Sequence, residues 1–126
     1  MDLRIRVFCG EQGVSEEEES DELDAEATQV VAVDESGVIA TCRLRYPEAA
    51  TCKLERMVVA KGVRELGVGG TLLAGAESEA RSQGAELMVL NAQRRAEPFY
   101  ARNGYVAEGE TFLEAGIEHV RMTKAL

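Results

Sequence analysis

The chain has little cysteine and no long hydrophobic run, and these two absences exclude several classes of protein. Its three cysteines, Cys9, Cys42 and Cys52, are odd in number and lack the close paired spacing of a zinc site. Neither a disulfide framework nor a structural metal is therefore expected. No segment approaches the roughly 18 to 20 consecutive apolar residues of a membrane-spanning helix, and the first residues lack the apolar segment of a signal peptide. We expect a cytoplasmic protein with no membrane partner.

Positive charge is also scarce. The 126 residues contain 14 Lys and Arg against 23 Asp and Glu, which gives a formal net charge of −9 at pH 7. Nucleic-acid binding normally needs a basic face, so DNA and RNA are not expected partners. The length and the hydrophobic share of 45% predict a single domain over residues 1–126 that buries its core without disulfides or metal.

The most informative segment joins a strand-like run to an amphipathic helix through glycines. Residues 54–59 are typical of a strand, and the glycine-rich turn over 64–71 follows. Apolar residues then recur at helical spacing, namely Val68, Leu72, Leu73, Ala76 and Ala80. Glycines let backbone N–H groups approach an anion, and the unpaired donors of a first helical turn, together with the helix dipole, favour negative charge. The segment predicts a phosphate-binding turn flanked by Lys61 and Arg64.

The other patterns predict a mixed α/β fold of the α+β kind. A short helix is expected over residues 3–12, and the acidic block at 16–26 is expected to be loop or frayed helix. Strands are predicted at 29–33, 38–46, 51–59, 87–90, 105–106 and 118–124, and further helices over 67–83 and 96–102. A strand–helix–strand connection of this length normally returns parallel. The strands at 51–59 and 87–90 should therefore be parallel neighbours whose carboxyl ends face one crevice.

These residues resemble the GCN5-related N-acetyltransferase (GNAT) superfamily. Its acetyl-CoA signature, Arg/Gln-x-x-Gly-x-Gly/Ala, is matched by Arg64, Gly67 and Gly69. Nearly the whole chain is also similar, in the order and spacing of its motifs, to the ElaA-like branch of this superfamily. The matching segments lie at 7–14, 24–28, 53–56, 91–93, 98–105 and 112–122.

The resemblance implies a mixed twisted sheet, flanked by helices, whose parallel fourth and fifth strands splay apart around the pantetheine arm of CoA. Main-chain groups of Met57 and Val59 would bond pantetheine, and backbone N–H groups of the turn and the Thr71 hydroxyl would meet the pyrophosphate. Asn91, just past the fifth strand, would lie beside pantetheine, and Tyr100 beside the acetyl thioester. The full set of expected acetyl-CoA contacts is Met57, Val58, Val59, Arg64, Glu65, Leu66, Gly67, Val68, Gly69, Gly70, Thr71, Asn91, Phe99 and Tyr100.

The chain departs from the family pattern in three places. Almost nothing precedes the helix expected near Leu3, so either the start of the chain is assigned late or the first edge strand is missing. An uncovered edge is a pairing liability, which a partner chain, as in a homodimer, or a shortened edge would offset. Glu65 and Leu66 replace small and basic residues inside the turn, and Gln29 stands where this branch often has histidine.

Acetyl transfer from a thioester to an amine requires a neutral amine, a polarised carbonyl and a proton for the leaving thiolate. Glu55, on a strand beside the crevice, is the candidate base, because desolvation raises the pKa of a carboxylate. The alternative for Glu55 is an ion pair with Arg56 or Arg43. Tyr100 is the candidate acid, since a phenol can donate to a thiolate in a dry site. The alternative for Tyr100 is an ordinary core aromatic.

The remaining polar residues carry weaker signals. Nothing in the spacing pairs His119, the only histidine, with a cysteine, so Cys42 and Cys52 are expected in the core rather than as nucleophiles. For His119 a structural or substrate-edge role is favoured over catalysis. Arg94 and Arg95 either approach the CoA phosphates or are ordinary loop arginines. The acidic block either steers a cationic amine or is simply solvated.

The sequence thus predicts an N-acetyltransferase that moves the acetyl group of acetyl-CoA directly to a primary amine of a small molecule or peptide, with no metal. One alternative is a CoA-binding sensor or degenerate family member without turnover. Another is a nucleotide-binding module, because Gly-x-Gly-Gly follows a strand. The segment lacks a third glycine at the spacing of a dinucleotide site and an acidic residue about 20 residues further on, and no Gly-Lys-Ser/Thr is present.

Overall fold

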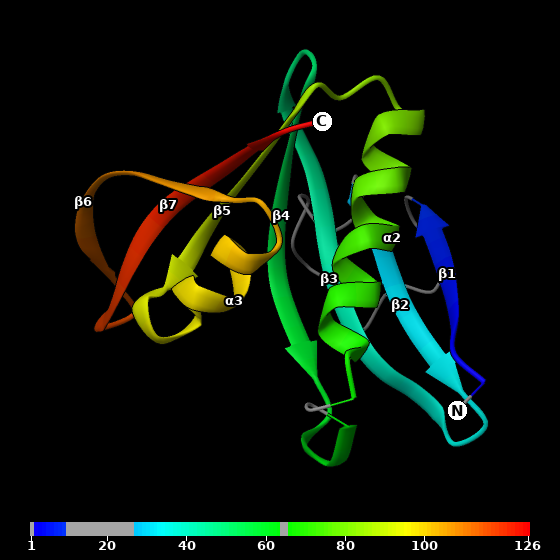
Figure 1. Ribbon diagram of the computed structural model, residues 1–126. Helices are drawn as coiled ribbons and strands as arrows, with labels where there is room; N and C mark the ends of the chain where they lie inside the picture. The colour runs from blue at the N-terminus through cyan, green and yellow to red at the C-terminus, as the bar shows by residue number, and fades with distance from the viewer. Residues whose placement is uncertain (1, 10–26, 64–65) are drawn as a thin grey trace.

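The computed structural model of the chain describes residues 2–9, 27–63 and 66–126. The acidic block at 16–26 and the residues Arg64 and Glu65 lie outside the described residues. Within the described ranges the strands form one mixed sheet in the order β1-β2-β3-β4-β5-β7-β6 (Figure 1). The strands are β1 (Arg4–Cys9), β2 (Thr28–Asp34), β3 (Gly37–Glu48), β4 (Thr51–Val59), β5 (Leu87–Gln93), β6 (Val106–Glu114) and β7 (Ile117–Ala125).

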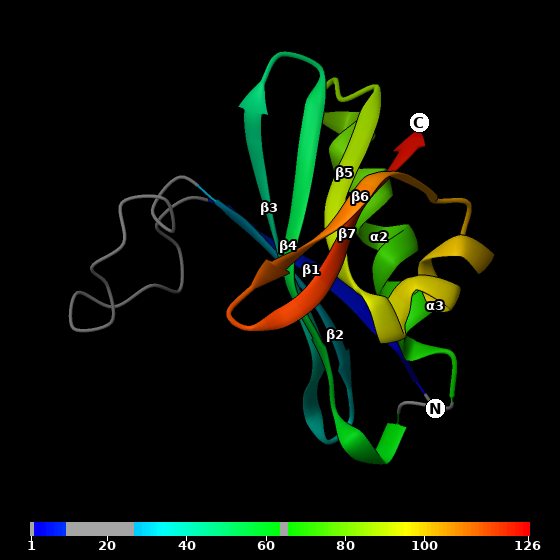
Figure 2. The ribbon, with the colours of Figure 1, turned by 90° about the vertical axis from the view of Figure 1, so that its left-hand side faces the viewer.

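Two α-helices of the described chain, α2 (Val68–Ser82) and α3 (Glu97–Arg102), lie on the same side of this sheet (Figure 2). Two short 3-10 turns, η1 (Lys61–Val63) and η2 (Arg94–Ala96), precede them. The mixed α/β architecture and both helices agree with the sequence prediction. Neither helix combines the length and the apolar character that crossing a lipid bilayer would require.

The start of the chain differs from the prediction. The helix expected over residues 3–12 is wrong for the residues that the structure describes, because Arg4–Cys9 is a strand that pairs antiparallel with β2. The edge strand expected to be missing is therefore present. The signal for it is the alternation of exposed Arg4 and Arg6 with Ile5, which has the period of two of a strand. Ile5 packs against the core below α2.

Helix α2 forms where the sequence predicts it. The five apolar residues at helical spacing, Val68, Leu72, Leu73, Ala76 and Ala80, are all buried against the sheet. The helix begins after Gly67, whose φ of 79° is left-handed, and the chain leaves it through Gly84 with a φ of 90°. Both glycines occupy backbone conformations that cost an L-residue with a Cβ about 1 to 2 kcal/mol.

The parallel strands β4 and β5 pair over only part of their length. The pairs run from Thr51 opposite Leu87 to Leu54 opposite Leu90 and stop there. Beyond this point β5 pairs with β7 and β4 remains on β3, so the two strands diverge (Figure 1). The predicted splay of the parallel pair is confirmed.

A β-bulge in β4 accompanies the divergence. Arg56 has a φ of 55°, which is left-handed, and the register of β3 with β4 shifts between Thr41 and Arg43. An extra residue on one strand bends that strand and re-aims the side chains around it. The bulge therefore lies where β4 turns away from β5.

Candidate functional site

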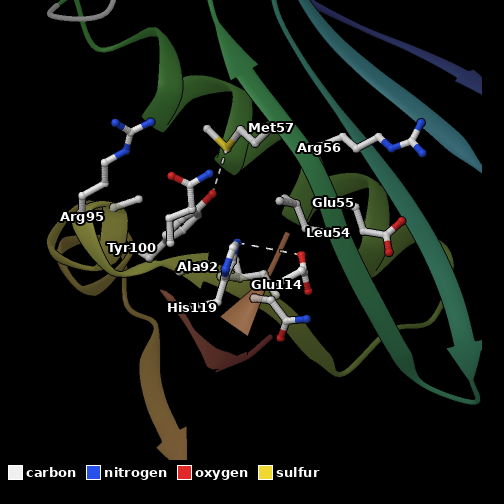
Figure 3. Close-up of a pocket in the computed structure, with 13 residues that line it drawn as sticks. Leu54, Glu55, Arg56, Met57, Ala92, Arg95, Tyr100, Glu114 and His119 are labelled. Carbon is white, nitrogen blue, oxygen red and sulfur yellow. Dashed lines mark hydrogen bonds and ion pairs between the residues drawn. The ribbon is translucent and has the colours of Figure 1, made fainter. Parts of the chain in front are cut away.

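Two cavities open at the place where β4 and β5 separate. The turn-side cavity, of about 630 Å³, lies among β4, the start of α2 and α3, and its lining includes Val58, Gly69 and Phe99. The hairpin-side cavity, of about 420 Å³, is bordered by Glu55, Asn91, Glu114 and His119 (Figure 3). The two share four lining residues, Met57, Arg95, Ala96 and Tyr100. The site is thus a divided passage with Tyr100 and Met57 in the common wall.

Backbone donors of the glycine turn face the turn-side cavity. The N–H of Thr71 donates to the Gly67 carbonyl at 3.1 Å, which is the first hydrogen bond inside α2. The N–H groups of residues 67–70 therefore have no acceptor within the helix, and Gly67 supplies no side-chain cap. The Thr71 hydroxyl donates to the same Gly67 carbonyl at 3.2 Å. In this conformation the Thr71 hydroxyl forms a bond within the helix rather than one directed at the cavity.

Space beside the turn depends on Gly69. A Cβ at Gly69 would lie 3.3 Å from Phe99 Cζ and 3.5 Å from Met57 Cε, whereas a Cβ at Gly70 would meet nothing closer than Asn103 Oδ1 at 3.8 Å. The first turn of α2 thus approaches α3 and β4 as closely as a bare backbone allows. A narrow passage beside N–H groups that lack an acceptor within the helix fits a phosphate-bearing chain that continues between the strands. Leu66, at the entrance, is 60% exposed.

Tyr100 is the buried polar group of the common wall. Its side chain is 9% exposed, its ring packs edge-on against Phe99 and Tyr105, and its hydroxyl donates to Met57 Sδ at 3.6 Å (Figure 3). Burial raises the pKa of Tyr100 to about 12. The phenol therefore keeps its proton at neutral pH, and thioether sulfur is only a weak acceptor for it.

Glu55 differs from the prediction made for it. Its carboxylate accepts two hydrogen bonds from Arg43, at 3.0 and 2.7 Å, and two from Arg45, at 2.9 and 2.6 Å. These bonds, from Arg45 above all, lower the pKa of Glu55 to about 2. The expected rise in pKa is wrong, because two guanidinium groups outweigh desolvation. The ion pair with Arg43, one of the two alternatives, is present, and Glu55 is not a proton acceptor near neutral pH.

His119 is a wall residue of the hairpin-side cavity. The residue is 7% exposed, its ring stacks on Phe112 with centroids 6.0 Å apart, and its Nδ1 lies 2.7 Å from the Ile117 carbonyl oxygen. The Nε2 atom faces Glu114, with 3.9 Å to Oε2 (Figure 3). The sequence favours a structural or substrate-edge role for His119 over catalysis. The residue lies opposite Gln93 on β5, at the strand that turns away from β4, and this register is not visible in the sequence.

Other predicted residues are divided between the two cavities. Asn91 lies inside β5 rather than just past it, because that strand continues to Gln93, and its side chain borders the hairpin-side cavity. Val58 and Val59 line the turn-side cavity. Arg95 borders both cavities, whereas Arg94 is half-exposed and pairs with Glu97 at 3.1 Å. The two loop arginines thus have different surroundings.

Cys42 and Cys52 are in the core, as predicted. Both are less than 2% exposed, and burial raises the pKa of Cys42 to about 12 and that of Cys52 to about 11. Since the thiolate is the nucleophilic form, neither thiol is activated.

Comparison with known proteins identifies the family of the chain. The family model for the acetyltransferase (GNAT) domain matches residues 2–126. The chain is 42% identical over 123 residues to YjcF of Bacillus subtilis, which is described as an uncharacterized N-acetyltransferase. The aligned region covers 97% of this chain and 87% of YjcF.

Two solved structures show the same fold. A GNAT family acetyltransferase from Elizabethkingia anophelis with acetyl-CoA bound superposes with a TM-score of 0.77 at 17% identity, over 98% of each chain. Escherichia coli ElaA superposes with a TM-score of 0.72 at 18% identity, over 88% of this chain and 76% of ElaA. With the matched sequence model and the splayed strands, the chain belongs to the GNAT acetyltransferase family.

Proposed function

We propose that this GNAT acyltransferase is an N-acetyltransferase that moves the acetyl group of acetyl-CoA directly to a primary amine of a small molecule or peptide. One observation carries the proposal. The pairing of β4 with β5 stops at Leu54 and Leu90, and the opening holds two cavities that share Tyr100 and Met57. Two substrates entering from opposite sides would meet at that wall.

The turn-side cavity is the proposed place of acetyl-CoA. The N–H groups of residues 67–70 that have no acceptor within the helix would receive the pyrophosphate, and Arg64 and Glu65 are proposed as further contacts. Main-chain groups of Met57, Val58 and Val59, with Asn91 across the gap, would hold the pantetheine arm, and Phe99 and Tyr100 would border its end. The contact between Gly69 and Phe99 supports this fit, because any larger residue would narrow the passage. Bound acetyl-CoA supplies an activated thioester.

Tyr100 is the proposed general acid. Because the pKa of Tyr100 is raised to about 12, the hydroxyl still holds its proton at neutral pH. The hydroxyl donates only a weak hydrogen bond to the sulfur of Met57. Turning the hydroxyl toward the leaving sulfur of CoA therefore costs little free energy. No covalent enzyme intermediate is needed, and the two buried cysteines are left out of the reaction.

A thermal-shift screen tests the binding half of this proposal. Acetyl-CoA and CoA should raise the melting temperature of the protein, because a ligand that binds only the native state stabilises it. NAD and ATP serve as controls for a nucleotide-binding module. Stabilisation by NAD or ATP without stabilisation by CoA would overturn the proposal.

The catalytic half is tested by following the thioester. Acetyl-CoA should be consumed by the protein when primary alkylamines and free amino acids are offered, and much more slowly without an amine. If acetyl-CoA stabilises the protein but no amine of the panel accelerates thioester loss, a CoA-binding sensor without turnover becomes the better description.

A further inference from the structure

The hydrogen bond at His119 fixes which ring nitrogen carries the proton. A carbonyl oxygen can only accept, so the Nδ1 atom that lies 2.7 Å from the Ile117 carbonyl must be the donor. In the neutral ring the lone pair is then on Nε2. Stacking on Phe112 at an interplanar angle of 23° holds the ring in this orientation. The lone pair of Nε2 is presented toward the hairpin-side cavity and Glu114 (Figure 3).

Two other titratable groups that line this cavity, Glu55 and Tyr100, do not accept a proton near neutral pH. The pKa of Glu55 is lowered to about 2 by Arg45 and Arg43, and burial raises the pKa of Tyr100 to about 12. The guanidinium groups of Arg56 and Arg95 have hydrogen-bond donors and no acceptor atom. From β5, the residue opposite His119 is the neutral Gln93. Glu114, from β6, is the carboxylate closest to the imidazole among the described residues, and it is 55% exposed.

The separation of Nε2 from Glu114 suits a ligand that bridges the two groups. At 3.9 Å they are too far apart for a hydrogen bond. An ammonium group lying beside this gap, on the cavity side, could donate one N–H to each. The carboxylate would favour the cationic form of an arriving amine, and the imidazole would be in contact with the proton that the amine must lose before it attacks.

We propose that His119 Nε2 is the proton acceptor for the acceptor ammonium, which Glu114 holds beside it, so that the acceptor is an amine that enters the hairpin-side cavity as a cation. The inference deepens the proposed function and rests on it. His119 is thereby a catalytic residue on β7, across the site from the acid Tyr100.

The protons and bonds balance without a further reactant. One proton of the ammonium passes to Nε2 and then to solvent, and the freed nitrogen lone pair forms the C–N bond at the acetyl carbon. The C–S bond breaks, and the departing sulfur takes the proton of the Tyr100 hydroxyl. The second proton that the nitrogen loses on becoming an amide returns to the Tyr100 oxygen. The products are the N-acetyl amine and the free thiol, with one proton released.

NMR of the imidazole provides a test that is independent of turnover. Since His119 is the only histidine, its ring nitrogen signals are unambiguous in protein labelled with nitrogen-15 at histidine. The neutral ring should show the proton on Nδ1. A ring that carries its proton mainly on Nε2 would overturn the proposal.

Ethylammonium is a suitable probe for the ammonium position. Titrating it into the protein should shift the His119 ring signals, and Glu114→Gln should weaken this binding at least tenfold. Glu118→Gln is the matched control, because Glu118 is similarly exposed at 56% and pairs with Arg94 outside the hairpin-side cavity. Equal binding by the Glu114→Gln variant and the wild type, or unmoved ring signals, would contradict the assignment.

His119→Asn separates proton transfer from structure. Asparagine can still donate to the Ile117 carbonyl but has no basic nitrogen. With the fastest amine of the panel, kcat/KM should fall about 100-fold at pH 7 and then rise about tenfold per pH unit, because only free amine from solution can react. A merely structural role would lower the rate equally at every pH.

If acetyl-CoA stabilises neither the wild type nor the His119→Asn variant, the proposed function has failed. If it stabilises both but their pH profiles are parallel, only the role of His119 has failed.

Discussion

At the scale of single residues, the surroundings of Tyr100 and Glu55 move their pKa values away from neutrality in opposite directions. Tyr100 is buried among aromatic rings and keeps its proton, whereas Glu55 is held by guanidinium groups and stays ionised. Tyr100 is thus a protonated phenol at neutral pH, and Glu55 is a fixed anion. The fixed anion orients Arg43 and Arg45 on β3, and it thereby ties that strand to the bulged strand β4.

Replacing Tyr100 by Phe tests the acid. The variant loses the hydroxyl proton but keeps the ring contacts, so kcat should fall by about 100-fold, the usual range for a positioned acid. The acetyl-CoA concentration that gives half-maximal thermal stabilisation should stay nearly constant. Steady-state kinetics on the wild type and the variant measure the first effect. Unchanged kcat would show that the leaving thiolate takes its proton elsewhere.

Glu55→Gln should act on stability. Removing the charge weakens four hydrogen bonds to Arg43 and Arg45 and leaves two guanidinium groups without their anion, at a cost of about 1 to 3 kcal/mol in the free energy of unfolding. Because the folded-state pKa of about 2 lies below the ordinary 4.5, this stabilisation is fully present above about pH 4.5 and disappears as the pH falls toward 2.

Urea unfolding at pH 7 and pH 3 measures this difference. The gap between the wild type and Glu55→Gln should narrow at pH 3, while the exposed control Glu118→Gln stays close to the wild type at pH 7. A gap of the same size at both pH values would contradict the assignment of the stabilisation to the Glu55 charge.

At the scale of secondary-structure elements, the start of α2 combines a proposed binding role with a backbone constraint. Gly67→Ala places a Cβ at a φ of 79°, which should destabilise the protein by about 1 to 2 kcal/mol. Gly70→Ala is the matched control, since its φ is not positive and its Cβ would meet nothing closer than 3.8 Å. Alanine is the better helix former, so this control should be stabilised by up to about 1 kcal/mol.

Chemical unfolding of both variants distinguishes a backbone effect from a general effect of adding a methyl group. Opposite signs are expected for residues 67 and 70. Loss of stability in both would mean that space around the turn, rather than the conformation of Gly67, is limiting.

The elements that the sequence predicts correctly are those whose signal is local. The apolar residues of α2 recur at helical spacing, and Gly84 marks its end. β4 has the predicted bounds, Thr51–Val59. The first strand is predicted wrongly as a helix because the alternation of exposed and buried residues is weak in so short a segment as Arg4–Cys9. Its partner strand β2 also lies far along the chain.

The parts of the site that the sequence does not predict depend on the register between neighbouring strands. Arg43 faces Glu55 across β3 and β4, and His119 faces Gln93 across β7 and β5. No local pattern reports which strand residues are opposite one another. Tyr100 was found only because a motif brought it to attention, since its burial and its place between two cavities follow from the packing of α3.

At the scale of the whole molecule, a buried polar cluster joins the two parts of the sheet that the splay separates. Glu77, on α2, is 5% exposed and accepts hydrogen bonds from Tyr105 at 2.8 Å and from Lys124 of β7 at 3.0 Å. Lys124 also donates to the Asn103 carbonyl at 3.0 Å. Because β4 and β5 pair only near one end, this cluster fixes α2 and the end of α3 to β7.

Lys124→Met should therefore destabilise the whole fold. The substitution keeps an apolar stem of similar length but leaves the buried Glu77 carboxylate without its cation, at a cost of about 3 kcal/mol. The double variant Glu77→Gln, Lys124→Met should recover part of that loss, because the uncompensated charge is gone. The free energy of unfolding of Lys61→Met, at an exposed lysine, should stay within about 0.5 kcal/mol of the wild type.

Urea unfolding of the single variants, the double variant and the control completes a double-mutant cycle. Strictly additive losses at Glu77 and Lys124 would show that the two side chains stabilise the fold independently, and that this ion pair does not join the two parts of the sheet.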